Sequence, residues 1–339
     1  MKKWIWVALS GLLVWNIILS VRVVGLSSSS SDGSVVVHNK VDTNDISSVV
    51  ESVKASIVSV ESDRDTYSGV VLESDDESLY VITVSEVKDS ENYIVFDSGS
   101  KKVATLVGYD NDTDLCVLKC DVDFHVDSFS LDSEDIEKGQ NVVGIGGRNS
   151  SVGNMTVSYG VCSDEGSYQM HTDSNYLSTM LETDMNVSEK QYGGALVDLS
   201  GSLVGIMTHH PQNASTHMSY AVSVDEIKNV YKQIKKDGSV TRGTLDITVR
   251  AIKDMESYEK NENGFELDTT EGLFVSSVSE SSCANGVLMH ADKIIKIDDK
   301  SMDSMSDFRD FQYSSESGEE VEIIYERNGE LNTSTVVLK

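Results

Sequence analysis

Residues 188–206 read SEKQYGGALVDLSGSLVGI, and this stretch decides how the chain folds around its candidate site. Two glycines, Gly193 and Gly194, stand between the bulky aromatic Tyr192 and a strand-like run that begins at Ala195. Because glycine adopts backbone conformations that other residues avoid, the pair predicts a tight turn that holds one side chain in a fixed place. That side chain is a tyrosine, and its chemistry decides what the site can do.

The length and charge of the chain limit the kinds of function it can have. Its 339 residues are enough for two domains with separate hydrophobic cores and an accessory segment. The chain has 27 Lys and Arg residues against 56 Asp and Glu residues, so its formal net charge at pH 7 is −29. Because this charge disfavours attraction to polyanions over most of the surface, we expect no nucleic-acid partner.

The four cysteines are scattered along the chain, at Cys116, Cys120, Cys162 and Cys283. They form no Cys-x-x-Cys pair of the kind that binds zinc or carries out redox chemistry. If Cys116 and Cys120 share a strand, they lie roughly 13 Å apart, which is too far for a disulfide. We therefore expect buried thiols rather than a disulfide.

The N-terminal residues predict a membrane anchor. Two lysines precede the uncharged apolar run Trp4–Val21, which reaches the lower limit of about 18 residues for a spanning helix. This run is longer than the core of a usual cleaved signal peptide, and no clear cleavage site follows it. We expect residues 1–24 to be a cytoplasmic stub with an uncleaved transmembrane signal-anchor, and the serine-rich residues 25–44 to be a flexible linker. The protein is then a single-pass protein of the cell membrane with its folded domains on the extracytoplasmic side.

A first folded domain over residues 45–238 is predicted to be almost entirely β. A short helical pattern that leads into a strand begins at Asp45, and ten apolar runs broken by turn residues follow it. The ten runs cover residues 68–74, 78–87, 92–97, 101–110, 115–121, 141–147, 155–163, 194–199, 202–210 and 218–224. Many short strands with little helix between them indicate an antiparallel barrel or sandwich.

This domain is predicted to end in a helix with clear start and stop signals. Ser223 and Glu226 are spaced for a capping box, and Gly238 is suited to terminate the helix. One face of the helix is apolar and is formed by Ile227, Val230, Tyr231 and Ile234. A compact α+β unit is predicted to follow over residues 242–339, with a buried strand at 273–278, a short helix at 304–313 and a hairpin turn at Asn328-Gly329.

The order and the sequences of these runs resemble those of the HtrA (DegP-like) family of serine proteases over residues 45–339. The family places its catalytic histidine in T-x-x-H-V-V, its aspartate in D-x-x-T-D-x-A-V-L-K and its nucleophile in G-N-S-G-G-P-L. This chain reads YVITVSEVKD, YDNDTDLCVLK and EKQYGGALVDL in the corresponding places. The resemblance implies a mainly β fold: a trypsin-like double β-barrel followed by a PDZ domain.

Two of the three catalytic groups of the family are replaced in this chain. The aspartate position is Asp114, whereas the histidine position holds Glu86 and the serine position holds Tyr192. A tyrosine hydroxyl at the end of a rigid ring cannot take the place of a serine oxygen without moving the reacting carbon. A carboxylate at Glu86 lacks the two nitrogens through which an imidazole accepts a proton and is oriented. Lys190 stands where the family has the glycine of its oxyanion hole, so no catalytic set is intact.

The resemblance also implies a peptide-binding loop in the second domain. The family's carboxylate-binding loop, G-x-L-G-[IV], corresponds here to Gly243-Thr244-Leu245-Asp246-Ile247. Asp246 replaces a glycine and adds a Cβ and a negative charge beside the expected position of a peptide carboxylate. We therefore expect weakened capture of peptide C-termini and easier binding of an internal peptide or a basic tail.

These features predict a membrane-anchored, extracytoplasmic pseudoprotease that binds proteins or peptides in envelope protein quality control or regulation, with no cofactor. Two alternatives remain open. One is an active serine-type endopeptidase of the family that uses an unrecognised nucleophile. The other is a structural partner of an active homologous protease, as a hetero-oligomer or within a homotrimer, because family members form trimers.

The same residues also have plainer interpretations. Glu86 and Tyr192 are expected to hydrogen-bond across a closed, inert cleft. Glu86 and Asp114 alone are too few to specify a metal site, so we expect no metal. His209 and His210 are adjacent on a predicted strand and are expected to point to opposite faces, which favours surface or cleft-lining positions over joint metal ligation.

Overall fold

The computed structural model describes residues 45–63, 65–132, 136–148, 154–170, 177–209 and 218–339. The predicted anchor and linker, residues 1–44, lie outside these ranges. Within the described ranges, no helix is both long enough and apolar enough to span a membrane.

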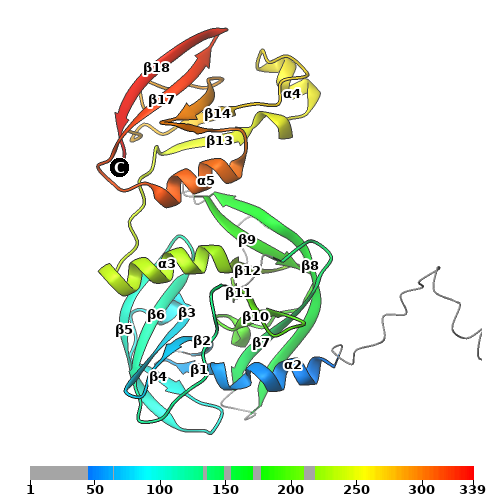
Figure 1. Cartoon of the computed structure of the whole chain (residues 1–339), viewed down its shortest axis with the longest axis vertical. Helices are drawn as coiled ribbons and strands as arrows, with labels where there is room; N and C mark the ends of the chain where they lie inside the picture. Colours follow the sequence, from blue (N-terminus) through cyan, green and yellow to red (C-terminus); the bar gives the residue numbers. More distant parts are fainter. Residues whose placement is uncertain (1–44, 64, 133–135, 149–153, 171–176, 210–217) are drawn as a thin grey trace, which may run out of the picture. The chain divides into compact units, whose positions relative to one another are not determined.

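The first domain is a pair of closed six-stranded antiparallel barrels (Figure 1). The first barrel has the strand order β1-β2-β3-β6-β5-β4, and the second has the order β10-β11-β12-β9-β8-β7. The first barrel consists of β1 (Ile57–Glu61), β2 (Thr66–Ser74), β3 (Ser78–Val84), β4 (Asn92–Val95), β5 (Lys101–Asp110) and β6 (Leu115–Asp121). The second consists of β7 (Asn141–Arg148), β8 (Met155–Met170), β9 (Leu177–Thr183), β10 (Ala195–Asp198), β11 (Leu203–Thr208) and β12 (Ser219–Ser223). The predicted double barrel is confirmed.

Strand β9 is the barrel strand that the sequence analysis missed. Its sequence, LSTMLET, neither alternates nor forms a continuous apolar run, so no periodic signal identifies it. It exists because it closes the second barrel, pairing with β8 on one side and β12 on the other. The short helix α2 (Ile46–Val53) before β1 agrees with the expected helical pattern.

Both faces of the central strands are buried, which explains why they read as nearly unbroken apolar runs. In β3, Val81 belongs to the interior of the first barrel, whereas the neighbouring Ile82 belongs to a second cluster shared by both barrels. Successive side chains of a strand point to opposite faces, so this alternation follows directly from strand geometry. The shared cluster also contains Ile145 from β7 and Ile206 from β11, so one continuous core joins the two barrels.

Helix α3 (Val224–Asp237) closes the first domain and packs against strands of both barrels, including β5, β6, β11 and β12 (Figure 1). Its predicted apolar face is buried, and it ends at Gly238 in the left-handed conformation, with φ of 76°. The predicted capping box is wrong: Ser223 is the N-cap, but its hydroxyl has no hydrogen-bond partner among the described residues. The carboxylate of Glu226 is fully buried and lies 3.7 Å from the guanidinium of Arg242 instead.

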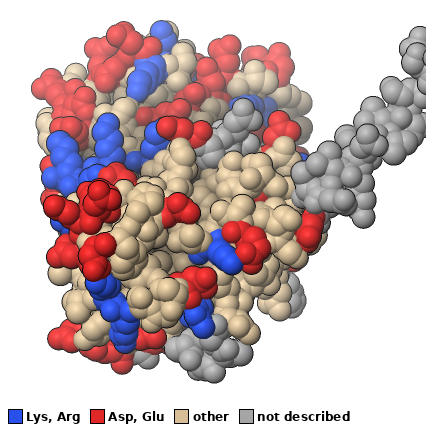
Figure 2. Space-filling view, turned by 60° about the horizontal axis from the view of Figure 1, so that its bottom comes forward, with Lys and Arg blue, Asp and Glu red and all other residues tan. Residues whose placement is uncertain are grey.

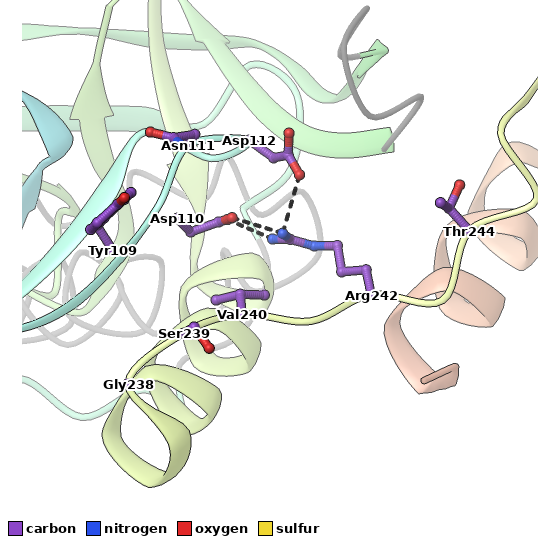
Figure 3. A pocket seen from close by; sticks show the side chains of 9 residues that line it. All are labelled: Tyr109, Asp110, Asn111, Asp112, Gly238, Ser239, Val240, Arg242 and Thr244. Carbon is purple, nitrogen blue, oxygen red and sulfur yellow. Dashed lines mark hydrogen bonds and ion pairs between the residues drawn. The ribbon is translucent and has the colours of Figure 1, made fainter. Parts of the chain in front are cut away.

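Arg242 fixes the segment that follows α3 to the first barrel (Figure 3). Its guanidinium donates to both carboxylate oxygens of Asp110, at 2.8 Å and 2.6 Å, and lies 3.4 Å from Asp112. Only 10% of the Arg242 side chain and 6% of the Asp110 side chain are exposed. Buried charges of this kind must be paired, so a two-point ion pair defines where the first domain ends. A pocket of about 420 Å³ lies at this junction.

The second domain is a six-stranded sheet with short helices, as predicted. Five strands run in the order β13-β14-β15-β17-β18, and β16 pairs with β15. They are β13 (Ile247–Ala251), β14 (Leu273–Val278), β15 (Lys293–Ile297), β16 (Lys300–Ser301), β17 (Glu320–Arg327) and β18 (Glu330–Val337). Its helices are α4 (Ser257–Glu262) and α5 (Met305–Ser314). The predicted hairpin turn joins β17 and β18, with φ of 52° at Asn328 and 81° at Gly329.

The four cysteines are free thiols, so the expected absence of a disulfide agrees with the structure. Cys116, Cys120 and Cys162 are buried, whereas Cys283 is only partly buried. Burial raises the pKa of the Cys116 thiol to about 12, so this group is inert near neutral pH.

The charged side chains are spread over the face of the molecule shown in Figure 2. Figure 2 shows many acidic side chains on the face in view, with basic side chains interspersed among them and an uncharged area between. The excess negative charge of the chain is therefore distributed on this face rather than gathered into one patch.

Candidate functional site

The glycine pair forms the predicted turn at the end of the short helix η4 (Glu189–Gln191). Gly193 has φ of 81°, and a Cβ at this position would lie 2.2 Å from the carbonyl oxygen of Ser68. A Cβ at Gly194 would lie 2.5 Å from the carbonyl oxygen of Ile145. Both positions therefore require glycine, because a side chain would collide with backbone of the neighbouring strands. The turn holds Tyr192 in place through a hydrogen bond from the amide of Gly193 to Met207, at 2.7 Å.

The backbone beside Tyr192 is engaged in internal hydrogen bonds. The amide of Tyr192 donates to the carbonyl of Glu189 at 3.2 Å. The carbonyl of Lys190 accepts from the hydroxyl of Ser68 at 2.6 Å, and its ammonium forms an ion pair with Asp65. An oxyanion hole needs backbone N–H groups that point at the reacting oxygen. The Tyr192 amide is committed to η4, so it does not offer that geometry.

Asp114 is the best-held side chain of the site. It precedes β6 in a left-handed conformation, with φ of 60°. One carboxylate oxygen accepts from the hydroxyl and the amide of Ser85, at 2.7 Å and 3.2 Å. The other oxygen accepts from the hydroxyl of Thr208 at 2.6 Å. The carboxylate therefore links the loop after β3 to the end of β11, and so links the two barrels.

His209 completes this group, together with Glu86. Glu86 lies in the short helix η3 (Ser85–Val87), and His209 directly follows β11. The Nδ1 atom of His209 lies 2.9 Å from Glu86 Oε1 and 3.1 Å from Asp114 Oδ2. One imidazole nitrogen is thus shared between two carboxylates. Among the described residues, these three are also the set whose donor atoms are close enough to share a metal ion.

The charges of this group reinforce one another. Hydrogen bonds with Asp114 and Glu86 raise the pKa of His209 to about 10, although partial burial opposes the shift. Burial acts to raise the pKa of Asp114, but hydrogen bonds with His209, Thr208 and Ser85 outweigh it and hold the pKa below its usual value. At neutral pH the group is therefore an imidazolium between two carboxylates.

Tyr192 packs on this ion network. Its ring and the His209 ring have centroids 4.3 Å apart at an interplanar angle of 48°. Burial and the nearby carboxylates of Glu189 and Glu86 raise the pKa of Tyr192, so its hydroxyl stays protonated. We expected Glu86 to hydrogen-bond with Tyr192 across the cleft, but the structure pairs Glu86 with His209 instead. An imidazolium held this way already carries the proton that a general base would accept.

A pocket of about 410 Å³ adjoins Tyr192. Its lining includes Met185, Val187, Met218 and Tyr220, with Tyr192 at one side. Polar groups of Asp184 and Ser219 also contribute to the lining. A concavity lined by both apolar and polar groups is suited to hold a peptide side chain.

The loop over residues 243–247 in the second domain contains one non-glycine residue in the left-handed backbone conformation. Asp246 has φ of 54°, and its carboxylate accepts from the hydroxyl of Ser281 at 2.7 Å. Three amides of the loop already donate within the domain. The amide of Gly243 donates to the carbonyl of Ser315, and the amide of Thr244 donates to the carbonyl of Lys339. The amide of Asp246 donates to the hydroxyl of Thr244. Leu245 and Ile247 are buried in the domain core.

Strand β13 follows this loop at one edge of the sheet, and α5 contacts it. An edge strand beside a helix is the arrangement to which an extended peptide adds as a further strand.

The sequence analysis placed Glu86, Asp114, Tyr192 and Lys190 at one site, and the structure brings the first three together around His209. Sequence reasoning named His209 only as a surface or cleft-lining residue. The available signal was its position at the end of β11, the second strand after the glycine turn. That signal does not reveal which loop of the other barrel lies opposite.

Two family models match the chain. One described as "Trypsin-like peptidase domain" matches residues 31–206, which is more than half of the chain, and one described as "PDZ domain" matches residues 243–338. The chain is 27% identical over 271 residues to "Serine protease Do-like HtrA" of Lactobacillus helveticus, covering 77% of this chain and 65% of that protein. It is 26% identical over 284 residues to the protein of the same name from Lactococcus lactis subsp. lactis, covering 80% and 70%. The chain thus spans about two thirds of the length of these relatives.

Solved structures agree with this relationship. The structure "HtrA-type protease AlgW with tripeptide" superposes with a TM-score of 0.70 at 25% identity, covering 86% of this chain and 96% of that chain. A serine endoprotease from Yersinia pestis superposes with a TM-score of 0.61 at 24% identity, with the same coverage, which supports the fold.

The charge state of His209 leads to a pH-dependent prediction. Its pKa is raised from 6.5 to about 10 in the folded protein, so its ion pairs stabilise the fold fully below pH 6.5. This stabilisation is lost progressively as the pH rises to about 10. We expect the melting temperature of the natural chain to exceed that of His209→Gln most strongly below pH 6.5 and hardly at all above pH 10. NMR titration of the imidazole, assigned with this variant, should show no deprotonation of His209 at pH 8. A His209 pKa near 6.5 would contradict the network.

Proposed function

This chain belongs to the trypsin-like peptidase family, in the HtrA branch that adds a PDZ domain, and from this premise we propose that it binds proteins or peptides without cleaving them. One observation carries the proposal. The nucleophile position at the glycine turn holds Tyr192, whose ring packs on an imidazolium fixed between Glu86 and Asp114.

Three requirements of acyl transfer are unmet in this arrangement. The hydroxyl of Tyr192 stays protonated and is carried on a rigid ring. In a catalytic triad, one imidazole nitrogen accepts the proton and the other is oriented by a carboxylate. Here the Nδ1 atom of His209 is shared by the carboxylates of Glu86 and Asp114. The amide of Tyr192 is bonded to Glu189 rather than directed at a reacting oxygen. Each loss alone reduces the rate strongly, and together they leave little of the catalytic machinery.

Binding surfaces are nevertheless retained in both domains. The pocket beside Tyr192 is suited to an apolar side chain, and the free edge of β13 is suited to an extended peptide. The solved relatives named above include one described with a bound tripeptide. We propose that the second domain of this chain also binds extended peptides, and that it favours internal segments or basic tails over free C-termini.

We also propose that the protein is anchored in the cell membrane by Trp4–Val21, with its folded domains on the extracytoplasmic side. The length and lack of charge of this run, and the two lysines before it, support this arrangement. The full chain should stay in the membrane fraction after an alkaline carbonate wash. Release into the soluble fraction would contradict the anchor.

Absence of proteolysis is the main prediction of this proposal. The full chain should neither degrade an unfolded protein substrate nor react with a fluorophosphonate probe for activated serines, because no activated serine stands at the turn. A family member with an intact catalytic triad, assayed in parallel, is the positive control. The double change Glu86→His with Tyr192→Ser, combined with His209→Ala to vacate the space beside Asp114, should restore measurable labelling.

Cleavage by the natural chain that persists in Tyr192→Phe and co-elutes with the protein would overturn the proposal. It would instead establish an endopeptidase with a different nucleophile.

The peptide preference makes a separate prediction about the PDZ domain. Asp246→Gly should strengthen binding of peptides with a free C-terminal carboxylate by about tenfold, or roughly 1.4 kcal/mol, because it removes a like charge and a Cβ. Asp246→Asn removes the charge but keeps the Cβ and tolerates the left-handed backbone, so it should recover part of the gain. Fluorescence anisotropy with free-acid and C-terminally amidated forms of one peptide measures the effect. Equal affinities for the natural chain and Asp246→Gly would contradict the assigned role of Asp246.

A further inference from the structure

The group formed by Glu86, Asp114 and His209 has the composition of a metal-ligand set. Each residue offers one donor atom, and these atoms all lie within 4.8 Å of one another. They come from two different barrels: Glu86 and Asp114 flank strands of the first, and His209 follows β11 of the second. Such convergence of an imidazole and two carboxylates at one point requires the tertiary structure.

The distances suit a small divalent ion. The Nδ1 atom of His209 lies 2.9 Å and 3.1 Å from the nearest oxygens of Glu86 and Asp114. A tetrahedral ion with bonds of about 2.0–2.1 Å holds its ligand atoms roughly 3.3 Å apart. The two distances to His209 therefore need to change by only a few tenths of an ångström to receive an ion.

A second observation points independently to a ligand at this position. The Oε2 atom of Glu86 is buried and has no hydrogen-bond partner among the described residues. The Glu86 side chain as a whole is 34% exposed, but this one oxygen has lost contact with water without gaining a partner, which is unfavourable. A cation bound between Glu86 and its neighbours would satisfy this oxygen, by direct contact or through a water on the ion.

The surroundings of Asp114 resemble those of an oriented metal ligand. Ser85 and Thr208 donate to its two oxygens, at 2.7 Å and 2.6 Å. Hydrogen bonds of this kind fix a ligating carboxylate in place and reduce the entropy lost when the ion binds. The ligand set is therefore partly preorganised.

The donor types select the ion. Calcium and magnesium prefer sites made entirely of oxygen, whereas an imidazole nitrogen with two carboxylates suits zinc. We propose that Glu86, Asp114 and His209 form a binding site for a divalent transition-metal ion, with Zn²⁺ as the matching ion. The sequence analysis expected no metal because two carboxylates alone are too few, and His209 supplies the missing third ligand.

Binding exchanges a proton on His209 for the metal ion. His209 must release its Nδ1 proton to the solvent, and the vacated lone pair then binds the ion. With Zn²⁺ bound, the charge of the ion balances the two carboxylates beside a neutral imidazole, so the site has no net charge. Without the ion, the imidazolium and the two carboxylates have a net charge of −1. The ion ties the two barrels together across the cleft, so it should stabilise the folded chain in proportion to its occupancy. This inference does not depend on whether the chain cleaves peptides.

The test uses the full chain without an affinity tag, stripped with a chelator and dialysed. Equilibrium dialysis with metal analysis should find one Zn²⁺ per chain that is lost in His209→Ala, and thermal melting followed by circular dichroism should show a rise in melting temperature with Zn²⁺. Glu86→Gln, which keeps the shape of the side chain, should weaken Zn²⁺ binding by about tenfold or more. His125→Ala is the matched control, because His125 lies 3.9 Å from Asp127 at an exposed site outside the cluster. It should bind Zn²⁺ as the natural chain does.

A direct spectroscopic readout guards against unfolding of the variants. In the natural chain, Zn²⁺ should shift the imidazole NMR signals of His209, and Mg²⁺ at the same concentration should leave them unchanged. The inference is overturned if the natural chain binds no Zn²⁺, if Glu86→Gln and the control variant bind it equally well, or if Mg²⁺ gives the same shift.

Discussion

The carboxylate of Asp114 is the contact on which the cleft between the barrels depends. It is largely withdrawn from water and must therefore be paired, and its partners come from both barrels: Ser85 from the first, and Thr208 and His209 from the second. Because Glu86 adds a second negative charge beside it, a cation at this point becomes necessary rather than optional. His209 provides that cation, and the imidazolium in turn provides the surface on which Tyr192 packs.

The glycine turn rests on close backbone contacts that do not involve the side chain of the residue before it. Gly193 and Gly194 lie so close to the backbone of Ser68 and Ile145 that no other residue fits without distortion. The absence of a side chain at these two positions lets β2, β7 and the turn approach closely. The glycine pair is therefore a poor indicator of activity by itself. The residue before it and the groups around that residue decide what the site can do.

In the PDZ domain, too, one loop has the backbone conformation of a glycine position but carries a different side chain. The loop at Asp246 keeps the left-handed conformation that a glycine would adopt, and aspartate tolerates it better than most residues. The side chain then places a carboxylate at the edge where a peptide would end. Several of the loop amides already donate within the domain, which further reduces the capacity of the loop to bind an anion.

The sequence by itself determined the elements that rest on local patterns: the apolar runs that became strands, the buried face and glycine end of α3, the Asn328-Gly329 hairpin and the turn before Ala195. The features that sequence analysis failed to predict share one physical cause. Strand β9, the partner of Glu226 and the position of His209 all depend on contacts between residues far apart in the chain, which periodicity and capping rules do not encode. Glu86, Asp114 and Tyr192 were placed at one site by the resemblance of their surrounding motifs to those of the HtrA family. Only the closure of two barrels against each other placed an imidazole between the two carboxylates, because that position is set by where separate strands end.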